Sequence, residues 1–384
     1  MNTKQADLII VGAGILGLSA AIQAREQGLS VLVFEKDAEA IGATRRNFGV
    51  VGTSTLSHPE SIWRQYAVET RQFYQCIQEK TNISLQPRQG LYLANTALQW
   101  QVLNEFSQRT AAYQINAKLL SPQQLGTHFS YLKPTTTVYG ALEVVGDYSV
   151  EPDLLAMRLL QYAAQLGVEI QCNACVVKTR SSSAGVWVEI ASGQHYQAAQ
   201  VMICHGEITQ ILYPEQLKRM GMQRCSLQMA LTEPYEHNLD ATIYSGLSIA
   251  RYPAFEVCPS YLQLKQETEQ GIVADYGIHI LLKQNRFGQL IVGDSHEYQS
   301  LDAARYYQQR EVIHQYILNY CKENIGLELP PIERRWTGYY LSHPDQLACI
   351  NEVEPNIYLI SSIGGKGMTT AAGFIKNFLE THIF

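Results

Sequence analysis

The chain lacks an excess of positive charge. Its 29 lysines and arginines are outnumbered by 35 aspartates and glutamates, which leaves a formal net charge of −6 at pH 7. Such a chain has neither the broad basic surface that attracts nucleic acid nor a polybasic membrane anchor. We therefore expect no nucleic-acid partner, and we expect any anionic small molecule to be held by a local group of arginines or lysines.

Long hydrophobic runs are also missing. The nearest approach is residues 8–24, which contain three glycines and are followed by a strand that ends in Glu35. The segment has no small-residue cleavage pattern, so we interpret it as neither a signal peptide nor a membrane span. No other run approaches the length of a span, and we expect no membrane segment.

Cysteine pairs with metal-ligand spacing are absent. The eight cysteines are scattered, and the only close pair is Cys172 and Cys175, with no second pair and no matching histidines. We expect these two residues to lie in a strand, where residues three apart face opposite sides. They are interpreted as half-buried thiols, which predicts no metal and a reducing compartment, the cytoplasm.

A glycine pattern near the N-terminus is the most informative feature that is present. An apolar strand at residues 7–11 leads into Gly12-Ala-Gly14-Ile-Leu-Gly17, then an apolar helix and a second strand that ends in Glu35. Gly12 allows a sharp turn, Gly14 lets the backbone approach a pyrophosphate, and Gly17 lets the helix pack against the strand. The helix N-terminus directs unpaired N–H groups at phosphates. Glu35 can accept hydrogen bonds from ribose hydroxyls and would repel a 2′-phosphate, so the pattern predicts binding of a dinucleotide other than NADP.

Segments typical of a nucleotide-binding domain recur far apart along the chain. The chain has no internal repeats and no long linkers. A helix from Pro152 to Gly167 precedes a strand, a second apolar strand at residues 200–206 ends in glycine, and Asn356–Ile360 leads into a glycine turn and an amphipathic helix. Between these pieces lie alternating, β-rich segments, with long helices expected at about residues 59–80, 97–115 and 302–322.

This order predicts an α/β fold in which a Rossmann-like nucleotide-binding domain is interrupted twice by a mixed, antiparallel β-sheet domain. The first domain is expected to comprise residues 1–50, 145–220 and 335–384, and the substrate-binding domain residues 51–144 and 221–334. Substrate and cofactor would then meet in the crevice between them.

The later glycine segments favour FAD over NAD. Gly42-Ala-Thr44 follows Glu35 closely enough to place backbone beside a longer cofactor. The turn Gly364–Gly367 and the helix after it can direct N–H groups and a positive dipole at the pyrimidine end of a flavin.

Taken together, the chain resembles the FAD-dependent amine oxidoreductases of the D-amino-acid oxidase, glycine oxidase and sarcosine oxidase superfamily over essentially its whole length. The resemblance rests on Gly12–Gly17 with Glu35, Val201–Gly206, Arg335–Gly338 and Gly364–Gly367. Two further segments, Gly42–Gly49 and Leu290–Tyr298, resemble a narrower clade that is proposed to oxidise aminophosphonates.

The resemblance implies a glycine oxidase-like fold and hydride transfer from a C–H bond next to an amine nitrogen to flavin N5, followed by imine hydrolysis. It implies a small amine substrate that carries a phosphonate, either 2-aminoethylphosphonate or a hydroxylated or N-methylated relative, in bacterial phosphonate catabolism. The alternative is a glycine, sarcosine or D-amino-acid oxidase or dehydrogenase.

One departure from the superfamily bears on the substrate. Relatives that oxidise amino acids supply an arginine after the Trp-x-Gly segment to grip the substrate carboxylate, whereas Tyr340 stands at that place in this chain. A phenol cannot make a bidentate charged contact. The substitution favours a substrate without an α-carboxylate, or one whose anion is held elsewhere. Alternatively, the register differs by a residue or two and Arg335 takes the role.

Four residues are predicted to act on the substrate or on the reduced flavin: Arg46, His296, Tyr340 and Lys366. Arg46, oriented by Asn47, would face the flavin or the substrate anion, unless it forms a surface salt bridge. Lys366 would stabilise negative charge on the reduced flavin, unless it is a solvated loop lysine. His296 is either a residue over the flavin face or a structural histidine.

Tyr340 and Trp336 are expected to shape the pocket, and Cys204 to be a buried packing residue rather than an attachment point for FAD. The residues expected to contact FAD are Gly12, Gly14, Ile15, Leu16, Gly17, Glu35, Lys36, Ala43, Thr44, Arg46, Asn47, Val176, Val177, His205, Gly206, Gly338, Gly364, Gly365, Lys366, Gly367, Met368 and Thr369.

Two other classes of protein share part of this pattern. A flavin-dependent hydroxylase also starts with a strand, a glycine turn, a helix and a second strand. Its Gly-Asp pair, however, lies on a strand of the nucleotide-binding domain, whereas Gly293-Asp294 lies in the β-rich insertion. A protein that keeps FAD for structure alone would bind the flavin without reduction by a substrate.

Overall fold

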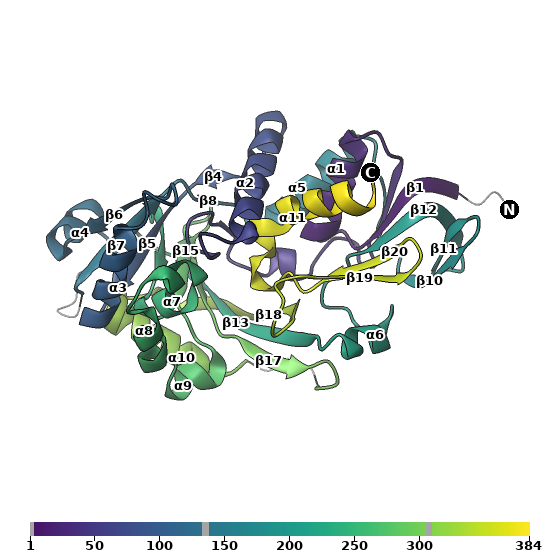
Figure 1. Ribbon diagram of the computed structural model, residues 1–384. Coiled ribbons are helices and arrows are strands. Elements are labelled where there is room, and N and C mark those ends of the chain that lie inside the picture. The colour runs from purple at the N-terminus through teal and green to yellow at the C-terminus, as the bar shows by residue number, and fades with distance from the viewer. Residues whose placement is uncertain (1–3, 133–137, 305–308) are drawn as a thin grey trace.

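The computed structural model describes residues 4–132, 138–304 and 309–384. Two large sheets organise them, and Figure 1 shows the sheets side by side along the molecule. Within the described ranges, none of the helices has the length and apolar character that a membrane span needs.

The first sheet is centred on β1 (Lys4–Val11), which pairs in parallel with β2 (Val31–Phe34) and β12 (His195–Ile203). Parallel pairing continues through β9 (Glu169–Gln171) beyond β2 and β20 (Ile357–Ser361) beyond β12. Antiparallel strands β10 (Val176–Ser182), β11 (Gly185–Ile190) and β19 (Cys349–Glu354) complete it. Strands from three distant parts of the chain therefore build one sheet, as expected for an interrupted nucleotide-binding domain.

Alternation along β1 sends its side chains to two separate cores. Leu8 and Ile10 pack with the helices on one face, whereas Ile9 and Val11 pack with the β10–β11 hairpin on the other. The helices of the first face are α1 (Ile15–Glu26), α2 (Ile62–Lys80), α5 (Pro152–Gln165) and α11 (Gly367–His382). The opposite face also carries α6 (Pro214–Arg219). Both faces of the parallel strands are thereby buried, which explains their continuous apolar runs.

The second sheet is mixed and is built around the long strand β13. Its strands are β5 (Gln89–Ala94), β6 (Asn116–Leu120), β7 (Gly140–Val145), β13 (Gln223–Pro234), β14 (Ala241–Tyr244), β15 (Leu281–Gln284), β16 (Gln289–Gly293), β17 (Glu297–Ser300) and β18 (Ile332–Ser342). Only β14 and β5 pair in parallel; the other described pairs of this sheet are antiparallel. A small sheet of β3 (Val50–Val51), β4 (Gln86–Pro87) and β8 (Tyr148–Ser149) lies beside it.

Helices cover both faces of the second sheet. One core contains residues of α3 (Ala97–Ser107), α7 (Gly246–Arg251) and α8 (Tyr261–Thr268). The other core contains residues of α4 (Pro122–His128), α9 (Gly271–Tyr276) and α10 (Glu311–Tyr320). Single-turn or irregular helical segments occur at η1 (Ala43–Arg45), η2 (Pro253–Val257), η3 (Cys321–Ile325) and η4 (Gly364–Lys366).

The expected domain division stays a prediction, but two of its segments pack with the sheet of the other domain. Residues 335–342, assigned to the nucleotide-binding domain, belong to β18 and pair with β13 in the second sheet. The helix α2, assigned to the substrate-binding domain, packs in the core that covers the first sheet. Strand pairing and helix docking follow long-range contacts, which a linear division cannot show.

The local expectation for the close cysteine pair was also partly wrong. Cys172 and Cys175 lie in the irregular turn between β9 and β10 rather than within a strand, and Asn173 between them has a φ of 54°. Both are partly exposed free thiols, as expected.

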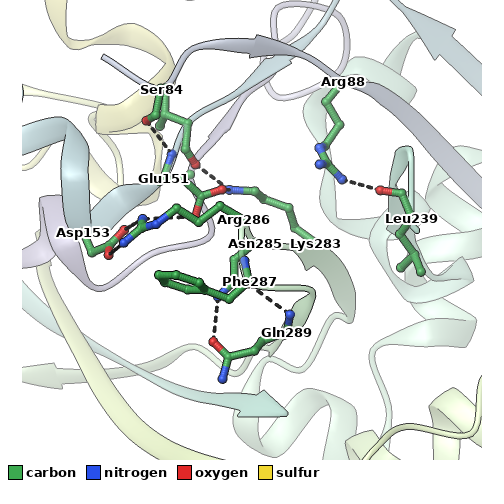
Figure 2. A network of polar contacts seen from close by, with 12 residues as sticks. Ser84, Arg88, Glu151, Asp153, Leu239, Lys283, Asn285, Arg286, Phe287 and Gln289 are labelled. Carbon is green, nitrogen blue, oxygen red and sulfur yellow. Dashed lines mark hydrogen bonds and ion pairs between the residues drawn. The ribbon is translucent and has the colours of Figure 1, made fainter. Parts of the chain in front are cut away.

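Charged side chains tie the second sheet to the start of α5, as Figure 2 shows. Lys283 of β15 is fully buried, donates a hydrogen bond to the carbonyl oxygen of Val150, and lies 3.8 Å from a carboxylate oxygen of Glu151. Nearby, both terminal nitrogens of Arg286 donate to Asp153, at 3.0 and 2.9 Å. Burial lowers the pKa of Lys283 to about 8. The ammonium group compensates a carboxylate that is itself only 5% exposed.

Lys283→Met tests this connection. Removal of Lys283 leaves the buried Glu151 with the more exposed Arg286, 3.9 Å away, as its remaining ion-pair partner. We expect a loss of about 3–5 kcal/mol in the free energy of unfolding, measured by urea denaturation. The matched control is Lys218→Met, because Lys218 forms its 2.7 Å ion pair with Asp302 in solvent and should lose less than about 1 kcal/mol. Equal losses in the two variants would contradict this account.

Candidate active site

A cavity of about 670 Å³ lies between the two sheets. It runs from the glycine turn after β1 to the residues around β18 and η4. Ligand pockets commonly measure about 300–1,000 Å³. The cavity is therefore large enough for a cofactor with a substrate beside it.

The glycine turn packs backbone against backbone. A Cβ atom on Gly12, whose φ is +103°, would lie 2.5 Å from the carbonyl oxygen of Cys204, and one on Gly17 would lie 1.9 Å from the carbonyl oxygen of Gly12. Gly14 instead borders the cavity, and its nearest neighbour would be the hydroxyl oxygen of Thr44 at 3.5 Å. The three glycines thus have the different environments that their expected tasks require.

Glu35 holds the turn in place from the end of β2. Its carboxylate accepts hydrogen bonds from the N–H groups of Ala13 at 2.9 Å and Asp37 at 3.1 Å, and it borders the cavity. Each carboxylate oxygen retains acceptor capacity for a ribose hydroxyl. The Ile15 N–H group donates to the hydroxyl of Thr44 at 2.9 Å, which fixes η1 against the start of α1.

Several buried polar atoms of the cavity wall have no hydrogen-bond partner among the described residues. Nε2 of His205 and Oγ of Ser361 are two of them. Burial lowers the pKa of His205 to about 4, so the ring is neutral. Buried polar groups normally have hydrogen-bond partners, so these atoms fit a wall that contacts a polar cofactor.

Of the residues predicted to contact FAD, all but Gly17 and Val177 line the cavity. Gly17 lies behind the turn and acts through packing. Val177 was wrongly expected there, because side chains alternate along β10: Val176 is buried and borders the cavity, whereas Val177 is 38% exposed.

The adjacent arginines point in different directions. Arg45 forms an ion pair of 2.6 Å with Glu39 away from the cavity, whereas Arg46 borders it. Asn47 shapes this loop, since its side-chain amide donates to the carbonyl oxygens of Ala43 and Thr44 and its oxygen accepts from the Gly49 N–H group. The loop thereby directs Arg46 toward the cavity.

Aromatic and cationic side chains meet at the other end of the cavity. Arg251, at the end of α7, donates to the hydroxyl of Tyr298 at 3.2 Å, and both residues border the cavity together with Tyr340 and Lys366. Burial, followed by repulsion from Arg251, lowers the pKa of Lys366 to about 8. Lys366 is therefore a partly buried cation in the cavity wall rather than a fully solvated loop lysine.

Arg251 is the functional candidate that sequence reasoning missed. It ends the otherwise apolar helix Gly246–Arg251, and no motif marks it. Arg335, the alternative anion holder, does not line the cavity and lies 3.5 Å from Glu311. Tyr340 does line it, and the indole N–H of Trp336 donates to the Arg46 carbonyl oxygen at 3.3 Å.

A third group in the wall combines His296 with two residues that were not predicted. Nε2 of His279 lies 3.2 Å from one carboxylate oxygen of Asp294, and Nε2 of His296 lies 3.9 Å from the other. Burial, followed by the charge of Arg251, lowers the pKa of both imidazoles, and burial raises the pKa of Asp294 to about 8. Backbone bonds between residues 279 and 294 bring the group together.

Comparison with known proteins identifies the cofactor. A profile of the family described as "FAD dependent oxidoreductase" matches residues 7–376. The chain belongs to this family. FAD is therefore its cofactor. The glycine turn, Glu35 and the polar atoms of the cavity wall fit that cofactor.

Solved structures share the whole architecture of the chain. Glycine oxidase from Geobacillus kaustophilus superposes with a TM-score of 0.77 at 16% identity, over 98% of this chain and 95% of that chain. L-α-Glycerophosphate oxidase from Mycoplasma pneumoniae with FAD bound gives 0.78 at 16% identity, over 98% and 94%. The predicted α/β fold with mixed sheets is thus confirmed.

Among curated proteins, human mitochondrial dimethylglycine dehydrogenase is 24% identical over 193 residues, which cover 49% of this chain. N-methyl-L-tryptophan oxidase of Escherichia coli K12 is 24% identical over 220 residues, which cover 54% of this chain. The matches span 22% and 56% of the lengths of these two relatives.

Glu35→Ala tests the nucleotide end of the cavity. The change removes the acceptor for two backbone N–H groups and for ribose hydroxyls, and hydrogen bonds to a charged group contribute about 1.5–3 kcal/mol. We expect the Kd for FAD to rise by about ten- to a hundredfold, measured by quenching of flavin fluorescence in the apoprotein. Glu39→Ala removes a carboxylate outside the cavity and should leave the Kd unchanged; the account fails if both variants bind FAD like the parent.

Proposed function

We propose that the protein oxidises a small amine whose anionic group is held by Arg251, and that this substrate is an aminophosphonate. The observation that carries the proposal is the partly buried guanidinium of Arg251, which donates to the hydroxyl of Tyr298 in the cavity wall. An arginine on α7 supplies the charged grip that Tyr340 on β18 cannot make.

Charge in the cavity supports a phosphonate over a carboxylate. Besides Lys36, which follows Glu35 at the nucleotide end, three cationic side chains border it, Arg46, Arg251 and Lys366. Phosphate-like groups carry up to about two negative charges at neutral pH and offer three acceptor oxygens, so they suit several cations better than a carboxylate does. The resemblance of Gly42–Gly49 and Leu290–Tyr298 to the aminophosphonate clade points the same way. The alternative remains a glycine, sarcosine or D-amino-acid oxidase or dehydrogenase, since Arg251 can also bind a carboxylate.

Residues of the chain orient the substrate, exclude water and supply positive charge for the hydride transfer. FAD, when bound, supplies the hydride acceptor. Arg251 and Tyr298 orient the anion, so that the C–H bond next to the amine has a fixed direction. Apolar side chains in the wall, such as Phe48, Met229 and Leu281, exclude water. The ammonium of Lys366 and the N-terminus of α11 offer positive charge where negative charge develops.

The cellular setting is part of the proposal. All eight cysteines are free thiols, which is consistent with a reducing compartment such as the cytoplasm. A role in phosphonate catabolism follows from the proposed substrate.

Anaerobic mixing of the FAD-loaded protein with candidate amines tests the function. We expect the visible flavin absorbance to bleach with 2-aminoethylphosphonate or its hydroxylated or N-methylated forms, and to bleach more slowly with glycine, sarcosine and D-alanine. Reduction by the carboxylates alone would overturn the phosphonate and favour the alternative. Reduction by NADPH alone would indicate a hydroxylase, and no reduction at all would indicate a structural role for FAD.

Arg251→Met tests the anion grip. Loss of the charged contacts should raise the Kd of the reducing amine by about ten- to a hundredfold, while the limiting rate of flavin reduction falls less. Stopped-flow measurements over a range of substrate concentrations separate the two quantities. Arg45→Met is the matched control, because Arg45 pairs with Glu39 outside the cavity. An unchanged Kd in Arg251→Met would show that the anion is held elsewhere.

A further inference from the structure

We propose that His279, Asp294 and His296 form a binding site for one divalent first-row transition-metal ion, such as zinc, in the wall of the cavity. The site goes beyond the proposed oxidation, since neither FAD chemistry nor the grip of Arg251 requires a metal. The open coordination positions of the ion face the cavity, where the ion can bind an anionic oxygen atom of a ligand.

The three side chains present one donor atom each toward a common point. Their ligand atoms all lie within 4.8 Å of one another, and Nε2 of His279 lies 3.2 Å from a carboxylate oxygen of Asp294. Ligands bound at about 2.0–2.2 Å in adjacent positions lie roughly 3–3.5 Å apart, so small side-chain movements close the set around an ion. All three residues are less than a tenth exposed, which limits those movements.

The two imidazole rings have the separation that shared coordination needs. Their centroids are 5.0 Å apart with 23° between the ring planes. Two imidazoles that bind one ion through nitrogen at about 2.1 Å in adjacent positions place their centroids about 5 Å apart.

The outer nitrogens have the partners typical of metal-bound histidines. Nδ1 of His296 lies 3.3 Å from the carbonyl oxygen of Gly277, which can only accept, so this nitrogen carries the proton. Nδ1 of His279 lies 3.4 Å from the hydroxyl oxygen of Ser248, whose own proton goes to the carbonyl oxygen of Ile280. Both Nε2 atoms therefore present lone pairs on the side of Asp294. Such outer hydrogen bonds fix the ring and the tautomer in metal sites.

The ligand set indicates the kind of site. Two histidines and one carboxylate leave positions open, which distinguishes them from the closed four-ligand sets of structural zinc. Arg251 repels a cation in the same cavity, and Asp294 offsets that charge when it binds the ion. The open positions face the cavity, where a phosphonate or carboxylate oxygen can bind.

Zinc binding by the FAD-loaded protein tests the site. After treatment with a chelator and dialysis, the protein is titrated with Zn²⁺ alone in a calorimeter, and the bound metal is counted by elemental analysis. We expect one zinc per chain and a rise in Tm with zinc. Asp294→Ala and His279→Ala should lower the affinity at least a hundredfold, and Ser248→Ala by about ten- to a hundredfold.

The matched control is His314→Ala, which removes a buried histidine of α10 outside the cavity and should keep the full zinc affinity. Far-UV circular dichroism and retained FAD show which variants are folded. If a variant of a metal ligand does not fold, Ser248→Ala still tests the site, because it keeps all three ligands. A parent protein that binds no zinc overturns the proposal, as does an equal loss in His314→Ala. No substrate enters this test, so its failure leaves the proposed oxidation untouched.

Discussion

The nucleotide end of the structure depends on one region of close contact, in which backbone packs on backbone and no side chain lies between them. Gly17 of α1 lies over the carbonyl oxygen of Gly12, and Gly12 lies against the carbonyl oxygen of Cys204 at the end of β12. There is no room for a single carbon atom at either position. This contact sets the distance between α1 and the two central strands, and thereby the depth at which Glu35 and the helix N-terminus border the cavity.

A second close approach couples the two sheets. A Cβ atom on Gly338 of β18 would lie 3.1 Å from the carbonyl oxygen of Arg46, which also accepts a hydrogen bond from Trp336. The loop after β2 is thus held against a strand of the second sheet, and the buried Lys283 holds the start of α5 to that sheet. The cavity therefore has one wall from each half of the structure. One wall carries the glycine turn and Glu35, and the other carries Arg251, Tyr298 and Tyr340.

The sequence predicted the nucleotide half well because its signals are local. A turn, a helix start and a strand end lie within 24 residues from Gly12 to Glu35, and each has a distinct residue requirement. Arg46 was separated from Arg45 by its place in the motif, and the structure puts one inside the cavity and the other outside. The prediction for Val177 fails because neighbouring residues of a strand face opposite sides, and Val176 is the one that faces the cavity.

The substrate half could not be predicted to the same degree, because its residues meet only through long-range pairing. Arg251 ends a short apolar helix, and His279 reaches Asp294 across a pair of backbone hydrogen bonds. Neither position has a local pattern that marks function. Tyr340 has a recognisable place after the Trp-x-Gly segment, whereas Arg251 borders the same cavity from the end of α7.

The account's central claim is that flavin and substrate anion share this cavity, with the anion on Arg251. A crystal structure of the FAD-loaded protein with aminomethylphosphonate tests it most directly. The account predicts the flavin between the glycine turn and η4, with phosphonate oxygens within hydrogen-bond distance of Arg251 and Tyr298. A flavin outside this cavity, or a phosphonate bound away from Arg251, would contradict it.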